Sequence, residues 1–239
     1  MTEPPVDAVP ARDAVILDVP ETSREAHARL LGKPPGPAIT VGGVELVVGL
    51  PEWASSSGLL IGEADDTGGA VRLTRRRGLA VADGGRYHPA AVHGLTLGVV
   101  GPESRECEQD RASDGESDVV GLDHLVLLSP NADRTIATMC GRLGFDLRLD
   151  RVQDWGVHQL FLRRAALLVE VVIQDGDPYG DDALWGTAWR TADIDATHAR
   201  LTAEGVTVSE VRTGRKPGTR VATVKDPALG IPTIVIEQR

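Results

Sequence analysis

The chain has 239 residues and a formal net charge of −10, with 41% hydrophobic and 25% charged residues. This length gives room for one large or two small domains, and the composition is that of a globular protein with a sizeable core. The acidic balance argues against nucleic acid, whose phosphates require a basic face, and disfavours anionic membrane surfaces.

Targeting signals and cysteine usage indicate a cytoplasmic protein. The chain has no run of about 18 apolar residues, and its polar, proline-rich start, MTEPPVDAVP, has no signal-peptide pattern. Cys107 and Cys140 fit no metal-binding or redox spacing, so two free thiols in a reducing compartment are expected. We therefore predict a cytoplasmic protein without membrane contact.

Composition divides the chain into two halves. Residues 102–119 are polar, mostly charged and without apolar periodicity, which predicts a linker. Residues 1–12 are expected to form a flexible tail. These boundaries leave an N-terminal unit over residues 13–101 and a C-terminal unit over residues 120–239.

The N-terminal unit begins with a strand, a helix and two further strands. They are expected in AVILDVP (14–20), ETSREAHARLLG (21–32), PAITV (37–41) and VELVVG (44–49). The segment 58–81 then parallels residues 183–208. The triplets that begin at Arg72 and Arg200 are both Arg-Leu-Thr, and the pairs that begin at Ala64 and Ala192 are both Ala-Asp, at one offset. An internal duplication accounts for a match in this order.

The C-terminal unit shows a βαβββ order twice. A branched, apolar strand over 122–128 leads into Asn131, which can cap a helix over 132–143 that Gly144 ends. Further strands of this first copy are expected at 145–150, 157–163 and 166–173. The second copy has a strand at 184–191, a helix at 194–204 and strands near 206–211, 220–225 and 233–237.

Four stretches of this unit carry a resemblance to a known family: GLDHLVLLSPNADRTIATMCGRLGF, LLVEVV, WGTAWRTADIDATHARLTAEGV and VKDPALGIPTIVIE. With them, the chain resembles the vicinal oxygen chelate superfamily, which includes glyoxalases, bleomycin-resistance proteins, methylmalonyl-CoA epimerases and extradiol dioxygenases. The resemblance is good over residues 120–237 and weak but continuous over 13–100. It implies an α+β fold of tandem βαβββ modules that form two curved mixed sheets, each around a cleft.

The resemblance also implies a site in the C-terminal unit, with a degenerate N-terminal unit. Metal-dependent members have four ligand positions. Three of them are matched here by His124, Glu170 and Glu237, whereas the third in chain order falls at Trp185 and Gly186. Zn, Mn, Fe, Ni or Mg is therefore the implied cofactor.

The strand pattern around these residues supports a shared site by an independent argument. Side chains alternate between the faces of a strand, so His124, Glu170 and Glu237 each share a face with apolar neighbours. Buried carboxylates are costly unless they are paired or bound to metal, and a divalent cation would also relieve their repulsion. The alternative is a vestigial site, in which His124 bonds locally, Glu170 lies at a rim and Glu237 is solvated.

Four further residues are candidates for contact with a ligand. His158 would supply a second imidazole from a neighbouring strand, or lie in the core or on the surface. Trp185 and Trp189 share strand parity and would form a stacking wall, unless they pack beneath the helices. Arg215, in the hairpin GRKPGTR, would attract a carboxylate or phosphate of the substrate, unless this hairpin is a solvated turn. In the N-terminal unit the ligand positions fall at Ala14 and near Val48.

We therefore expect a two-unit, glyoxalase-like protein, monomer or homodimer, that binds a small molecule. The first hypothesis is a metal-dependent lyase or isomerase in which Glu170 is a ligand or the catalytic base. The second is a metal-free binding or sequestration protein of the bleomycin-resistance kind. The third is an enzyme like the extradiol dioxygenases, which the missing second histidine disfavours because that chemistry uses two histidines and one carboxylate. A structural or regulatory partner protein is a further alternative.

Overall fold

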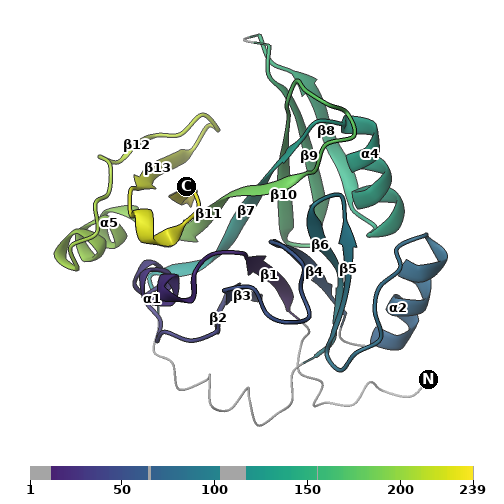
Figure 1. Cartoon of the computed structure of the whole chain (residues 1–239). Coiled ribbons are helices and arrows are strands. Elements are labelled where there is room, and N and C mark those ends of the chain that lie inside the picture. Colours follow the sequence, from purple (N-terminus) through teal and green to yellow (C-terminus); the bar gives the residue numbers. More distant parts are fainter. Residues whose placement is uncertain (1–11, 64–65, 103–116, 155, 239) are drawn as a thin grey trace, which may run out of the picture.

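The computed structural model describes residues 12–63, 66–102, 117–154 and 156–238. They form two mixed sheets with helices between and beside them (Figure 1), which confirms the α+β prediction. The predicted tail and most of the predicted linker lie outside the described residues, as do Cys107 and Ala64. No helix in the described part of the chain is both long and apolar enough to span a membrane.

The eight-stranded sheet consists of two βαβββ modules. The first contains β7 (Val119–Ser129), α4 (Ala132–Ile136) with its π-helical continuation (Ala137–Arg142), β8 (Asp146–Val152), β9 (His158–Arg164) and β10 (Leu167–Ile173). The second contains β11 (Ala183–Thr191), α5 (Ile194–Ala203), β12 (Arg212–Thr213), β13 (Thr219–Val224), the 3-10 turn η3 (Pro227–Leu229) and β14 (Thr233–Gln238). The strand order is β12-β13-β14-β11-β7-β10-β9-β8, so the modules meet where β7 and β11 pair antiparallel.

The first strand after α5 is shorter than predicted. In place of a strand over 206–211, the chain forms the two-residue β12 and an isolated bridge between Val208 and Val224. The hydroxyl of Ser209 accepts the amide N–H of Thr223 at 2.9 Å, so a side chain takes a hydrogen bond that a ladder would have used.

The six-stranded sheet has one strand fewer in each module. Its elements are β1 (Asp13–Leu17), η1 (Glu21–Ser23), α1 (Arg24–Leu31), β2 (Ala38–Val41), β3 (Val44–Val48), β4 (Gly58–Gly62), α2 (Thr67–Arg76), β5 (Tyr87–Val92) and β6 (Leu95–Val100). The strand order β2-β3-β1-β4-β6-β5 again places the first strands of the two modules, β1 and β4, side by side at the centre. The described N-terminal modules are thus βαββ units, and the repeat seen in the sequence corresponds to a repeat in the fold.

Side-chain caps fix the start of α4 and α5, the helices of the two modules that form the eight-stranded sheet. The side chain of Asn131 accepts the amide N–H of Arg134 at 2.9 Å. The side chain of Asp193 accepts the amides of Asp195 and Ala196 at 2.9 and 3.0 Å. Such caps satisfy amides that have no partner within the helix, and they fix how far each helix start lies from the strand before it.

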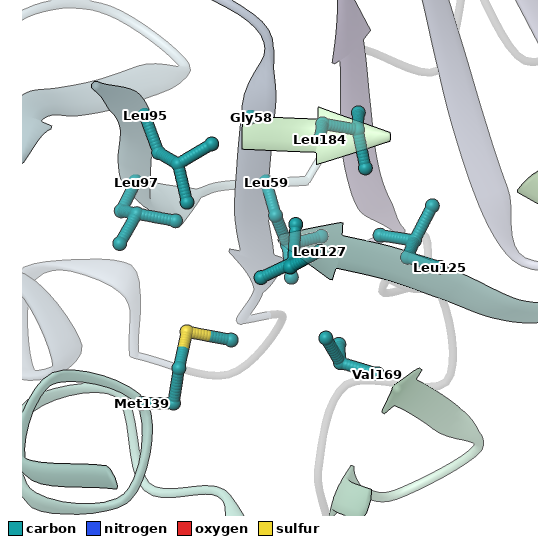
Figure 2. A pocket seen from close by; sticks show the side chains of 9 residues that line it. All are labelled: Gly58, Leu59, Leu95, Leu97, Leu125, Leu127, Met139, Val169 and Leu184. Carbon is teal, nitrogen blue, oxygen red and sulfur yellow. The ribbon is translucent and has the colours of Figure 1, made fainter. Parts of the chain in front are cut away.

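One apolar core lies between the two sheets. It combines residues of the six-stranded sheet with one side of the eight-stranded sheet, the core face, where the buried residues are Leu125, Leu127, Leu160, Leu162, Val169 and Val171. Figure 2 shows where the halves meet, around an apolar cavity lined by Leu59 and Leu97 on one side and Leu127 and Val169 on the other. Its volume of about 10 Å³ holds at most a single water, so it is a packing defect and not a ligand site.

Polar contacts also join the halves at α1, which lies near η3 (Figure 1). His27 of α1 is fully buried, and its Nε2–H donates to the carbonyl of Leu229 at 3.0 Å. Burial lowers the pKa of His27, so the ring is neutral and its Nδ1 has no hydrogen-bond partner among the described residues. Arg200 of α5 binds the carboxylate of Asp118 and the carbonyl of Leu30, which fixes the end of α1 against the second half.

The other side of the eight-stranded sheet, the open face, is half-buried. Along β7, β10 and β9 its residues alternate with those of the core face. It carries His124, Val126, Leu128, Phe161, Leu168, Glu170 and Val172. The open face therefore combines apolar side chains with His124 and Glu170, two of the residues predicted to form the site.

Candidate functional site

The registers of β7 and β10 bring His124 and Glu170 together on the open face. Glu170 pairs with Val126, and Val126 shares a face with His124 two residues earlier. The His124 Nε2 and Glu170 Oε2 atoms are 3.8 Å apart, and the two side chains are 16% and 19% exposed. These two of the three predicted ligands share a site.

A β-bulge in β7 adds Asp123 to this site. Ala188 of β11 lies opposite His124, but the next residue of β11, Trp189, lies opposite Leu122, so Asp123 has no opposing residue. A bulge breaks the alternation of faces and re-aims the extra side chain. This explains how neighbouring residues make a side-chain hydrogen bond, in which Nδ1–H of His124 donates to Oδ2 of Asp123 at 2.8 Å.

Asp123 is ionised in this setting. The hydrogen bond from His124 holds the pKa of the Asp123 carboxyl below its ordinary value, although burial opposes the shift. The positive charges of Lys216 and Arg190 act in the same direction as the hydrogen bond. Lys216 belongs to the hairpin between β12 and β13, and its ammonium donates to Oε1 of Gln238 at 3.0 Å. The predicted basic hairpin thus reaches the site through Lys216, which the sequence did not distinguish from its neighbours.

Neutral side chains hold Glu170 from the other side. Nε2 of Gln159 donates to Oε1 of Glu170 at 2.5 Å, and Nε2 of Gln153 donates to Oε1 of Gln159 at 2.6 Å. The chain of amides fixes the Glu170 carboxylate without neutralising its charge. Asp123 stands beside His124 in the stretch that carries the family resemblance, but no role was predicted for it. Gln159 belongs to no motif, and the register of β9 against β10 is what would have identified it.

Glu237, the third predicted ligand, lies on the opposite face of the sheet. Val235 pairs with the fully buried Trp189, and Glu237 shares the face of Val235. Its carboxylate accepts the amide N–H of Ile194, at the start of α5, at 3.2 Å and faces Nη1 of Arg220 at 3.4 Å. The predicted convergence of three ligands is therefore not formed, because Glu237 stabilises the start of a helix on the core side.

Internal symmetry identifies the counterpart of His124 in the second module. His124 precedes the helix cap Asn131 by seven residues (124 to 131), and Gly186 precedes the cap Asp193 by seven (186 to 193). This agrees with the predicted third position at Trp185 and Gly186. A glycine has no side chain to bind a ligand or a metal.

The counterpart of Glu170 follows from the same symmetry. Glu170 pairs with the residue two positions after His124, and Ile234 pairs with Ala188, the residue two positions after Gly186. The fourth position is therefore Ile234, three residues before the predicted Glu237. Of the four related positions, the two in the first module carry potential ligands and the two in the second module do not.

Two of the remaining predicted contacts are His158 and Arg215. His158 pairs with Ile173, on the opposite face from Glu170, and its Nε2 is 2.7 Å from Asp150 Oδ1. Arg215 is exposed in the β12–β13 hairpin.

The two tryptophans do not form one wall. Trp185 is the extra residue of a second irregularity, between Leu184 and Gly186, and is 49% exposed. Trp189 is fully buried, and its Nε1–H donates to Thr187 Oγ1 at 3.1 Å. The added residue breaks the strand parity on which the prediction depended, and Trp189 packs in the core.

The six-stranded sheet carries apolar residues at the related positions. The pairing of β1 with β4 and β3 corresponds to the pairing of β7 with β11 and β10. Ala14 therefore occupies the place of His124, and Val47 the place of Glu170, one residue before the predicted Val48. Neither side chain can bind a metal.

This face of the six-stranded sheet is also filled. The ring of Trp53 stacks on Tyr87 with centroids 4.3 Å apart. Glu45, which is 1% exposed, lies 2.6 Å from Nη2 of Arg86 and accepts the hydroxyl of Tyr87 at 2.7 Å. An ion pair and an aromatic stack thus occupy this face of the six-stranded sheet.

The donor set does not fit the implied metal. Among the described residues, no three His, Cys, Asp or Glu side chains are grouped so that they could hold a metal ion. Zinc sites in proteins have at least three protein ligands, and Mg²⁺ is usually held by carboxylates without histidine. His124 and Glu170 supply two, and Asp123 is hydrogen-bonded to the far nitrogen of the same imidazole.

Comparison with known proteins gives one family. Residues 123–223 match the model of the glyoxalase/bleomycin resistance protein/dioxygenase superfamily. A search of curated proteins found no match.

Solved structures share the fold at low sequence identity. A variant of 4-hydroxymandelate synthase from Streptomyces coelicolor is 12% identical, with a TM-score of 0.68 over 99% of this chain and 93% of that chain. A fusion of a xylose isomerase-like TIM barrel with 4-hydroxyphenylpyruvate dioxygenase is 14% identical, with a TM-score of 0.67 over all of this chain and 50% of that chain. Methylmalonyl-CoA epimerase from Mycobacterium tuberculosis is 21% identical over 54% of this chain and 95% of that chain, with a TM-score of 0.44.

Proposed function

We propose that the open face of the eight-stranded sheet binds a small organic molecule, and that it does so without a metal ion; the match of residues 123–223 to the glyoxalase/bleomycin resistance protein/dioxygenase model supports this proposal. The observation that carries this proposal is the placement of the acidic residues. Glu170 faces His124, whereas Glu237 is bound to Ile194 and Arg220 on the other face. The first module thus offers polar groups to a ligand, and the second offers an apolar surface at Gly186 and Ile234.

The hypothesis of a metal-dependent lyase or isomerase loses support because Glu237, its third ligand, lies on the core side of the sheet. The hypothesis of an enzyme similar to the extradiol dioxygenases also loses support, because His158, the candidate second histidine, lies on that side too. A binding protein of the bleomycin-resistance kind needs no metal ligands, and a mainly apolar surface with a few polar groups is typical of small-molecule sites.

Metal analysis together with ligand mapping tests this proposal. Protein purified without chelators and then incubated with Zn, Mn, Fe, Ni or Mg should retain far less than one equivalent of any of them. A fragment library followed by NMR should shift resonances of the open face, such as those of Val126 and Ile234. Stoichiometric metal that is lost in His124→Ala but kept in Glu237→Gln would overturn the metal-free proposal.

A further inference from the structure

Strand β8 forms one edge of the eight-stranded sheet, and no other described strand pairs with its outer side (Figure 1). All seven of its residues are exposed. Three of the eight large hydrophobic side chains that are exposed in the described residues lie on this strand: Leu147, Leu149 and Val152, at 40%, 43% and 63%. An edge strand also presents backbone N–H and C=O groups that can pair with another strand. The edge therefore offers both hydrogen bonds and apolar contacts to a partner.

A second copy of the chain can pair antiparallel with β8 about a two-fold axis. In such a contact, residue i of one copy faces residue j of the other, and residue j faces residue i. Opposite residues of a continuous sheet point to the same face, so i and j have the same strand parity and the axis passes through one residue. The register centred on Leu149, the middle residue of the strand, gives the longest overlap.

The charges of β8 favour the same register. Leu149 pairs with Phe161 of β9, so it points to the open face. Its neighbours Arg148 and Asp150 then point to the other side of the sheet. A contact centred on Leu149 places Arg148 of each copy opposite Asp150 of the other. A contact centred on Arg148, Asp150 or Arg151 places two identical charges opposite each other at the axis, which is destabilising.

Both charged groups are accessible to a partner. Arg148 is exposed and has no ion pair within the described residues. Asp150 contacts Nε2 of His158 at 2.7 Å, and its side chain is still 50% exposed. Charges on an edge strand commonly keep other copies away. On β8 their order is such that two antiparallel copies attract each other.

We propose that two copies of this chain associate through β8, antiparallel and centred on Leu149, with an ion pair between Arg148 and Asp150 on each side of the axis. The contact joins the two eight-stranded sheets into one and places both open faces on the same side. It needs no ligand and is independent of the proposed small-molecule site. Because a contact through one strand is small, the dimer is weak, and its population rises with protein concentration.

Sedimentation velocity of the whole protein, over a series of concentrations up to about 0.1 mM, measures the dimer. Arg148→Asp turns both ion pairs into repulsions and should weaken the dimer at least about tenfold. The double variant Arg148→Asp/Asp150→Arg exchanges the two charges, restores both pairs and should recover the dimer. Arg72→Asp makes the same change of charge on α2, where the side chain is 67% exposed, and should leave the dimer unchanged. Circular dichroism checks that each variant is folded.

A cysteine at the axis tests the register directly. Leu149→Cys places two thiols opposite each other, where the Cα atoms of an antiparallel pair are about 4.5–5.5 Å apart, within the range of a disulfide. Under mild oxidation this variant should form a covalent dimer much faster than Val152→Cys, whose side chain is more exposed but lies off the axis. The parent protein, which has cysteines of its own, gives the background rate.

Three results would overturn the inference. They are a protein that is monomeric at every concentration, a dimer that Arg148→Asp leaves unchanged, and equal rates of cross-linking for Leu149→Cys and Val152→Cys. The second result would assign the dimer to another surface of the chain. None of the three bears on ligand binding at the open face, which the fragment library tests separately.

Discussion

The buried ion pair of the six-stranded sheet should be sensitive to the loss of one partner. Arg86→Met keeps an unbranched apolar side chain but removes the guanidinium 2.6 Å from Glu45, which is 1% exposed. Breaking one side of a buried ion pair costs about 3–5 kcal/mol. The hydrogen bond that Glu45 still receives from Tyr87 places the expected loss at about 3 kcal/mol. For a chain of this size, that corresponds to a decrease in Tm of about 6–12 °C.

Thermal and urea unfolding at pH 7, followed by circular dichroism, measure this loss. The matched double variant Glu45→Met/Arg86→Met removes both charges and should recover most of the stability, because an apolar pair of similar volume avoids the cost of desolvation. A loss below about 1 kcal/mol in Arg86→Met, the range of exposed pairs, would refute the reasoning. So would a double variant less stable than the single one.

Three further substitutions test the site and the core. Asp123→Asn should lower the free energy of unfolding, measured by urea titration at neutral pH, by about 1–3 kcal/mol. Because the pKa of Asp123 is lower in the folded state, the difference between the variant and the parent should persist at pH values above 3.8, the ordinary pKa of an aspartate, and vanish at lower pH. Burial lowers the pKa of His27, so the unfolded chain binds more protons, and stability should decrease as the pH falls below the ordinary value of 6.5. His27→Gln keeps a donor for the carbonyl of Leu229 and should reduce that decrease, whereas an unchanged pH profile would show that His27 is not its source. Trp189→Ala should cost about 3–5 kcal/mol in urea unfolding, and a near-neutral result would mean that Trp189 is not a core residue.

The sequence predicts most of the fold because local signals agree with one another. Apolar periodicity separates strands from helices, and cap residues such as Asn131 mark where each helix begins. The weak repeat between residues 58–81 and 183–208 corresponds to β4 with α2 and β11 with α5. The missing strand in each N-terminal module is visible in the sequence as a shorter spacing between these elements.

The site is predicted less well because it depends on register between strands. The alternation of side chains shows which residues of one strand share a face. It does not show whether residues of two different strands, such as Glu237 and His124, lie on the same face of the sheet. Counting from the helix caps would have identified Gly186, and the pairing of β11 with β14 was then needed to reach Ile234. Single added residues, at Asp123 and Trp185, reverse the parity locally, and the sequence gives no sign of them.

The core between the two sheets gives the N-terminal half a role in the candidate site, because it packs against the back of the open face. Leu125, Leu127 and Val169 lie directly behind the open face, and they pack against Leu59 and Leu97 of the other half. Without these contacts, the strands that hold His124 and Glu170 would expose the apolar side chains of their core face to water. The N-terminal half therefore supports the strands that carry His124 and Glu170, through the apolar residues that pack against them.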